Sequence, residues 1–303
     1  MSSIDSAVVT PIGRRQMVIG GLLALVTVTI WAIWIVGTRQ AVTVHLPLGW
    51  IGILRFGVPA LALAPFWWRG GLLPKGIDWR LVAIMVMGSG APFFILVVVG
   101  IRFAGAGQVG VLLPGTMPLF VALLSALVSG ERYSPSRLVG FALVALALVA
   151  TGGSALWAGQ GLGVLLIPLG AFLWGCYTLA FRKSGLDAIA ATGMIAAWST
   201  ILLVPFVLTE NPADFFHADP WILAGQFLSQ SVLSGVVALV CYGLSVRMLG
   251  SSRAAIFSAL APPLAALIAI PVLGEVPSLL TLIGVALAVV GVALGSGAVG
   301  ARR

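Results

Sequence analysis

The feature that most constrains this chain is a series of apolar stretches, each roughly 20 residues long, separated by short polar turns. A helix of that length crosses the hydrocarbon core of a bilayer, because all of its backbone polar groups are satisfied internally. We expect ten spanning helices, although a count of nine or eleven stays open: about 17–37, 47–68, 80–101, 103–128, 136–152, 162–181, 188–208, 221–246, 254–273 and 277–297. The sequence therefore predicts an all-α polytopic membrane protein.

The composition agrees with a membrane protein and excludes several other classes. Charged residues make up 8% of the chain, against about 25% in soluble domains. The net charge is +8, but the 16 Lys and Arg form no basic run, so we expect no nucleic-acid partner. Cys176 and Cys241 lie in apolar stretches and imply no disulfide or metal site. No phosphate-binding loop is present, and we expect no cofactor.

The basic residues predict the orientation, because positively charged loops stay on the cytoplasmic side. Thirteen of the 16 fall on the side of the N-terminus, two (Arg39 and Arg102) on the opposite side, and Arg55 inside a span. We therefore expect a multi-pass protein of the bacterial inner membrane, with cytoplasmic tails at 1–16 and 298–303.

The two halves of the chain resemble each other at an offset of 143 to 144 residues. Trp31, Trp34 and Arg39 match Trp174, Tyr177 and Arg182, and further on Pro118, Gly130-Glu131 and Gly140 match Pro262, Gly274-Glu275 and Gly284. These matches predict two repeats, 17–152 and 161–297, of five helices each. Because five is odd, the second repeat enters the membrane from the opposite side, and such inverted repeats place a substrate site near the midplane.

An aromatic-rich first helix and a Gly-Glu pair after the fourth helix of each repeat resemble the EamA-type exporters of the drug/metabolite transporter superfamily. Arg55, within Leu54-Arg55-Phe56, fits the pattern common in the first repeat of that family; the second repeat of this chain has no corresponding arginine. Overall, the chain is most similar to the bacterial YddG-type exporters of aromatic amino acids. The resemblance implies export of small metabolites such as amino acids, or of drugs, by a protein that is not an enzyme.

Several side chains inside the spans are candidates for substrate binding. Arg55 lies deep in its span, where a guanidinium either attracts a substrate carboxylate or satisfies free backbone carbonyls. Intramembrane aromatic residues either line a cavity or simply pack, and polar ones either complete the site or bond a neighbouring helix. These candidates are Trp31, Trp34, Phe93, Phe94, Trp174, Tyr177, Trp198 and Tyr242, with Gln108 and Ser258.

Glycine and proline residues in mid-span form a second group. Proline removes a backbone donor, and irregular backbone survives at membrane depth only where protein or a cavity shelters it. We expect either hinges or simple packing kinks at Gly88, Gly90, Pro92, Pro114, Gly115, Pro118, Pro262 and Pro263. Gly291-x-x-x-Gly295 predicts close helix packing, within the bundle or in a dimer, and no oligomer is required.

No Asp or Glu falls within a span, so the sequence gives no sign of an intramembrane carboxylate relay. We expect alternating-access export of an amino acid, aromatic or otherwise amphipathic, either down its gradient or coupled through a group that the sequence does not identify. A multidrug or other metabolite exporter is the alternative. A passive channel and an intramembrane enzyme remain minor ones; Gly88-Ser89-Gly90 lacks a histidine at membrane depth to act as base.

Overall fold

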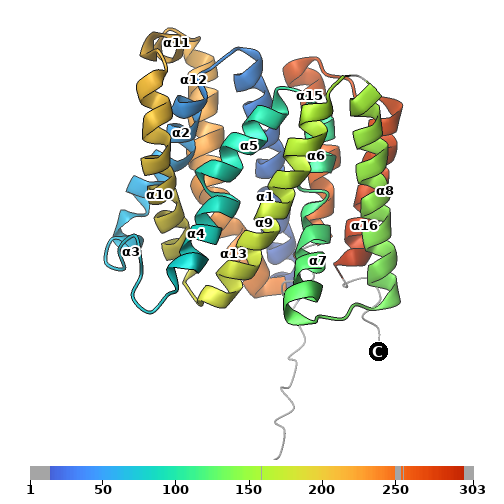
Figure 1. Ribbon diagram of the computed structural model, residues 1–303. Helices are drawn as coiled ribbons and strands as arrows, with labels where there is room; N and C mark the ends of the chain where they lie inside the picture. The colour runs from blue at the N-terminus through green and yellow to red at the C-terminus, as the bar shows by residue number, and fades with distance from the viewer. Residues whose placement is uncertain (1–13, 158, 250–253, 255, 297–303) are drawn as a thin grey trace, which may run out of the picture.

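The computed structural model describes residues 14–157, 159–249, 254 and 256–296. Within these ranges every regular element is a helix, and the helices form one bundle (Figure 1). The first repeat contains α1 (Arg14–Thr43), α2 (Leu48–Ala62), α3 (Ala64–Trp67), α4 (Trp79–Ser89), α5 (Ala91–Ile101), α6 (Ala106–Leu112), α7 (Met117–Ser129) and α8 (Pro135–Trp157). The second contains α9 (Gly161–Ser184), α10 (Ala188–Thr209), α11 (Pro212–Phe216), α12 (Pro220–Gln226), the π-helix η1 (Phe227–Val237), α13 (Ala238–Leu249), the 3₁₀ helix η2 (Phe257–Leu260), α15 (Ala261–Leu273) and α16 (Leu279–Gly295).

The number and length of the helices agree with the predicted spans. Seven helical segments among the described residues are long and apolar enough to cross a membrane, counting α4 with α5, α6 with α7, and α12 through α13 as one each. Three shorter apolar segments, Leu48–Ala62, Phe257–Leu273 and Leu279–Gly295, complete the set. The fold is therefore that of a ten-helix polytopic membrane protein.

Several predicted spans are not continuous helices. The span expected at 80–101 breaks at Gly90, whose extended backbone separates α4 from α5, and Pro92 stands in the first turn of α5. The span expected at 103–128 starts at Ala106 and breaks again between α6 and α7, where Pro114 and Gly115 lie. Proline cannot continue a hydrogen-bonded helical turn, which explains both breaks.

The same irregularities recur in the second repeat. Adding 144 to the break at 113–116 gives 257–260, the 3₁₀ helix η2, and Pro262 and Pro263 follow it in the first turn of α15. Adding 143 to the α4–α5 break leads into the π-helix η1. Helices α7 and α15 each have 13 residues, and each ends at a left-handed glycine, Gly130 (φ 64°) and Gly274 (φ 68°).

The packing follows the same pseudo-symmetry. Helix α1 packs against α13 and α15, and its counterpart α9 packs against α4 and α7; α2 faces α10, and α8 faces α16. Gly88 lies within α4 and not at the break between α4 and α5. Its lack of a side chain lets α4 approach α9 closely, because a Cβ on Gly88 would lie 2.7 Å from Tyr177 Cβ. In the α8–α16 contact a Cβ on Gly291 would lie 2.8 Å from the carbonyl oxygen of Gly140, so the Gly291-x-x-x-Gly295 pattern packs inside the bundle.

The two repeats are inverted, as Figure 1 shows. The described ends of α1 (Arg14) and α16 (Gly295) and the α7–α8 loop lie at the lower edge, whereas α11 and the α15–α16 loop lie at the upper edge. We call the lower edge the basic edge, because most of the described basic residues belong to the helix ends and loops found there: Arg14, Arg15, Arg69, Lys75, Arg80, Arg132, Arg137, Arg182, Lys183 and Arg247. The other is the opposite edge.

Candidate functional site

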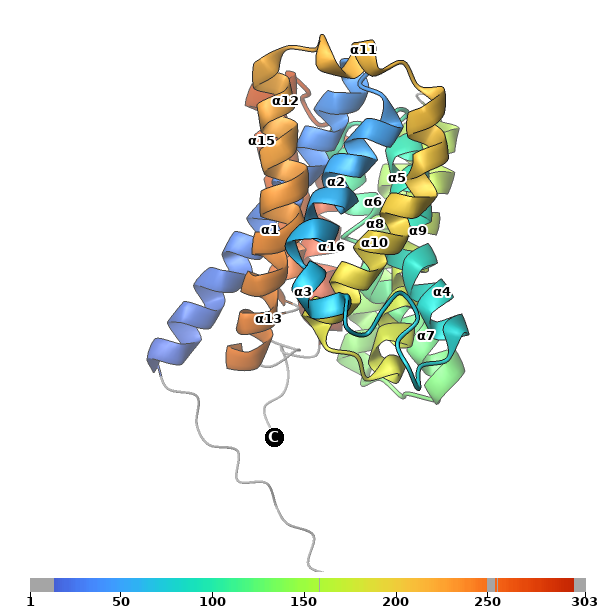
Figure 2. The same ribbon diagram turned by 90° about the vertical axis from the view of Figure 1, so that its left-hand side faces the viewer.

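A cavity of about 350 Å³ lies between the two repeats and reaches the basic edge. Helices α1, α7, α8, α9 and α13 and the end of α16 line it, together with Ala254 and Ser258. Figure 2 shows how α13 and the lower part of α1 stand away from α4 and α7, whereas the upper part of α1 contacts α5 and α6. We call this space the basic-edge cavity.

The inner end of the cavity has aromatic walls. Ala24, Val28 and Trp31 lie at helical spacing on the face of α1 that lines the cavity, and Trp174 of α9 lies on the opposite wall. Trp31 also contacts Tyr242 of α13, with ring centroids 5.8 Å apart. Flat apolar rings arranged in this way suit a ring or a branched aliphatic group.

Its mouth is charged and polar. Arg182 at the end of α9 and Glu131 in the α7–α8 loop both line the cavity and are exposed. Arg137 also lines it, but its Nε donates to the carbonyl oxygen of Gly295 at 2.9 Å and its guanidinium stacks 4.5 Å from the Tyr133 ring centroid. Burial, and then the negative charge of Glu131, raise the pKa of the Tyr133 phenol.

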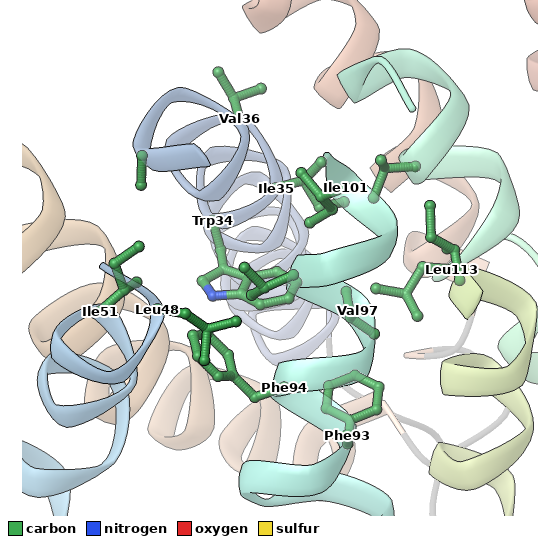
Figure 3. Close-up of a cluster of buried hydrophobic side chains, with 14 of the residues drawn as sticks. Trp34, Ile35, Val36, Leu48, Ile51, Phe93, Phe94, Val97, Ile101 and Leu113 are labelled. Carbon is green, nitrogen blue, oxygen red and sulfur yellow. The ribbon is translucent and has the colours of Figure 1, made fainter. Parts of the chain in front are cut away.

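The path to the opposite edge is closed. Arg39 Nε lies 2.7 Å from Glu275 Oε1, and Arg39 Nη1 donates to the carbonyl oxygen of Ile101 at 2.8 Å. Glu275 Oε2 accepts from the backbone N–H of Ala106 at 2.7 Å. Beneath this pair Ile35 and Ile101, 1% and 0% exposed, meet between α1 and α5 (Figure 3). These contacts separate the basic-edge cavity from a surface hollow of about 730 Å³ at the opposite edge, which Arg39, Arg102 and Glu210 help to line and which shares no lining residue with the cavity.

Four of the predicted binding residues line the basic-edge cavity, namely Trp31, Trp174, Tyr242 and Ser258, and so do Pro114 and Pro118 from the predicted hinges. Two more stand behind the Trp174 wall. The Phe93 ring centroid lies 5.6 Å from that of Trp174, and the Tyr177 centroid 5.1 Å from it.

Trp34 and Arg55 come together elsewhere, beside the π-helix. The Trp34 indole N–H donates to Gln230 Oε1 at 2.7 Å, and the Arg55 guanidinium carbon lies 5.5 Å from the Trp34 ring centroid. Arg55 Nη1 donates to Ser234 Oγ at 2.7 Å. Neither Trp34 nor Arg55 is among the residues that line the basic-edge cavity.

The remaining predicted residues also lie apart from the cavity. Phe94 is buried in the core between α1, α2 and α5, edge-on to Phe56 at 5.7 Å (Figure 3). Trp198 donates to the carbonyl oxygen of Leu72 at 2.8 Å, and Gln108 accepts from the backbone N–H of Gly105 at 2.9 Å, which caps the start of α6.

Glu131, Arg137 and Arg182 were not among the residues that the sequence singled out for binding. All three stand at span ends, where charge is a topology signal, so residue type alone does not mark them. A usable signal was present, however, because Arg182 and Glu131 are the repeat counterparts of Arg39 and Glu275.

Comparisons with known proteins agree with this architecture. The model of the EamA-like transporter family matches residues 18–152 and again 161–297. A "Probable terminal-alkyne amino-acid exporter" from Streptantibioticus cattleyicolor is 28% identical over 242 residues, which cover 78% of each chain. A solved structure described only as "Crystal structure of protein" superposes with a TM-score of 0.59 at 20% identity, over 91% of this chain and 94% of that one, and supports the fold.

The family match accounts for nearly the whole chain and falls on the two inverted repeats. Family and relative both indicate a membrane transporter of small molecules rather than an enzyme. The chain belongs to the EamA-like transporter family of the drug/metabolite transporter superfamily.

Proposed function

We propose that this protein exports an amino acid, aromatic or otherwise amphipathic, by alternating access through the basic-edge cavity. The observation that carries the proposal is the cavity itself, with aromatic walls at its inner end and both signs of charge at its mouth. A volume of about 350 Å³ lies at the small end of the usual range for ligand pockets, about 300–1,000 Å³. Such a space suits a single small metabolite.

The mouth suits a zwitterion. A guanidinium such as that of Arg182 pairs with a carboxylate, and a carboxylate such as that of Glu131 pairs with an ammonium group. An amino acid would meet these charges on entry and place its side chain between Trp31 and Trp174. The name of the Streptantibioticus relative, an amino-acid exporter, supports the same substrate class.

The charge distribution supports export as the direction of transport. If the basic edge is cytoplasmic, as the positive-inside rule predicts, the conformation seen is the one that loads substrate from the cell. The carboxylates of the described residues lie in loops, at helix ends or in the short loop helix α11, and none lies within a spanning helix. We therefore propose export down the substrate gradient. Flux that followed an imposed pH gradient with fixed stoichiometry would exclude this uncoupled mode.

The substrate class is testable in proteoliposomes with labelled phenylalanine, labelled threonine and a cationic dye. Saturable flux of phenylalanine, stimulated by the same amino acid on the far side, is expected. Flux of the dye alone would indicate a drug exporter, and flux that does not saturate would indicate a channel. Trp174→Leu should reduce amino-acid flux, whereas Trp198→Phe, outside the cavity, serves as the matched control.

Arg55 is the second candidate partner for a substrate carboxylate. Its contacts with Ser234 and Trp34 favour a role in holding α2 against the π-helix. We propose that Arg55→Gln leaves the KM for an amino acid unchanged, while Arg182→Gln raises it. The reverse result would move the carboxylate site to Arg55.

A further inference from the structure

We propose that Arg182 and Glu131 form the ion pair that closes the basic edge in the alternative conformation, in exchange for the Arg39–Glu275 pair seen here. The inference rests on the proposed alternating access and names the residues that hold each state shut. It follows from the inverted repeat, from the two edges of this structure, and from the charges on each.

The closed edge shows what such a pair does. Arg39 projects from α1, and Glu275 follows the left-handed Gly274 that ends α15. The carboxylate of Glu275 bridges the guanidinium of Arg39 and the start of α6, since its second oxygen accepts from the N–H of Ala106. Three helices are thereby held together over the buried Ile35.

The open edge carries the same residues in the same places. Arg182 projects from α9, the counterpart of α1, and Glu131 follows the left-handed Gly130 that ends α7, the counterpart of α15. The cavity-facing stripe of α9 is Trp174, Thr178 and Arg182. Shifted back by 143 residues it becomes Trp31, Ile35 and Arg39, the stripe of α1 that ends in the closed pair.

The two edges differ in whether the charges meet. Among the residues that the structure describes, Arg39–Glu275 is the one ion pair within 4.0 Å. Arg182 and Glu131 are exposed on the walls of the open cavity. Since the repeats are inverted, exchanging their conformations closes the basic edge and opens the other, which brings Arg182 to Glu131 and separates Arg39 from Glu275.

The neighbouring basic residues lack this correspondence. Arg132 and Arg137 match Val276 and Thr281 in the second repeat, which carry no charge. Arg137 is also held by the Gly295 carbonyl and the Tyr133 ring. Arg182 is therefore the cation that the symmetry assigns to Glu131.

The ion pairs themselves favour neither state strongly. Partly exposed ion pairs contribute little each, so replacing one by the other adds only a small difference in free energy between the two states. A carrier needs this balance, since a minor state must stay populated for substrate to shift it.

Two cysteine reporters at repeat-related positions can follow the exchange without any substrate. In a background carrying Cys176→Ser and Cys241→Ser, Ile35→Cys reports opening of the opposite edge and Thr178→Cys reports opening of the basic edge. The readout is the initial rate of labelling by a membrane-impermeant maleimide, added to one side of proteoliposomes at a time. Thr178→Cys is expected to label quickly from the basic edge and Ile35→Cys slowly from the other.

Removing one charge should shift both reporters in opposite directions. Glu275→Gln is expected to raise the labelling rate of Ile35→Cys and to lower that of Thr178→Cys. Glu131→Gln is expected to lower the labelling rate of Ile35→Cys. Each change should be about two- to five-fold, the range for a weak ion pair. Glu131→Arg with Arg182→Glu should restore the original rates. Arg132→Gln, next to Glu131 in the same loop, is the matched control and should change neither.

Two results would overturn the proposal. One is that the Ile35→Cys reporter is labelled at the same rate in the Glu131→Gln and Arg182→Gln backgrounds as in the Arg132→Gln background. The other is that Glu275→Gln does not raise the labelling rate of Ile35→Cys. Failure of the proposed function looks different. Labelling that shifts as expected, with no flux of phenylalanine, threonine or dye, refutes the substrate class and supports the exchange. Saturable flux with unchanged labelling supports transport and refutes the exchange.

Discussion

The two tryptophans of α1 stand three residues apart, but the same substitution should have a different effect at each. Trp31 lines the basic-edge cavity, whereas Trp34 is 7% exposed and donates from its indole N–H to Gln230 Oε1 at 2.7 Å. We predict that Trp31→Phe weakens substrate binding and that Trp34→Phe weakens the fold.

The magnitudes follow from the contacts. An aromatic contact is worth about 0.5–1.5 kcal/mol beyond area burial. The smaller ring of Trp31→Phe loses part of this, so the KM should rise up to about tenfold, at about 1.4 kcal/mol per factor of ten. Trp34→Phe removes the indole N–H that donates to Gln230 Oε1. A hydrogen bond between membrane helices is worth about 0.6 kcal/mol on average and up to about 1.7, so the free energy of unfolding should fall by that amount with the KM unchanged.

Two measurements separate the effects: the KM for amino-acid flux in proteoliposomes, and the unfolding free energy of the purified protein in SDS titrations. A double-mutant cycle between Trp34→Phe and Gln230→Leu should return a coupling of about the same 0.6–1.7 kcal/mol. If Trp34→Phe raised the KM as much as Trp31→Phe and left unfolding unchanged, both tryptophans would belong to the binding site, and the division drawn from the structure would be wrong.

Three further predictions concern stability. Gly140→Ala should lower the free energy of unfolding by about 1–3 kcal/mol, as overpacking does, because a Cβ there would meet the backbone of Gly291, 2.6 Å from its carbonyl oxygen; Gly153→Ala, where a Cβ meets nothing within 4 Å, should not. Ser199→Ala should cost about 0.5–2 kcal/mol, since Ser199 Oγ accepts the N–H of Ala91 at the start of α5. Because the pKa of the Tyr133 phenol is raised in the folded protein, the phenol loses its proton at a lower pH in the unfolded chain. The free energy of unfolding should therefore fall as the pH rises above about 10. Tyr133→Phe should remove this contribution to the pH dependence of unfolding.

Most of the fold was predictable because two independent signals agree. Hydropathy gives the spans, and the offset between Gly130-Glu131 and Gly274-Glu275 gives the inverted duplication. Proline and glycine also mark the breaks at Gly90 and at 113–116, since these residues disturb helical hydrogen bonding through their own chemistry.

The π-helix was not predicted, and the reason is tertiary. Over Phe227–Val237 no proline interrupts the chain. The irregular turns instead coincide with Gln230, which bonds to Trp34 and Thr38 across the interface with α1. Such contacts are invisible to local pattern, and only the repeat offset, carried from the break at Gly90, points to this segment.

For the candidate site, too, residue type is informative only where tertiary structure does not decide the outcome. Aromatic type selected Trp31 and Trp174, which line the cavity, and equally Trp34 and Trp198, which do not, because residue type does not say which face of a helix meets the cavity. Residue type does not indicate the charged mouth for a different reason: Arg182 and Glu131 stand at span ends, where charge also reports topology. In an inverted duplication, however, the pair Arg182 and Glu131 lies at one edge and its repeat counterpart, Arg39 and Glu275, at the other. Under the exchange proposed above, a conformation that brings one pair together separates the other. In a duplicated membrane sequence of this kind, a matched pair of opposite charges therefore marks a candidate gate.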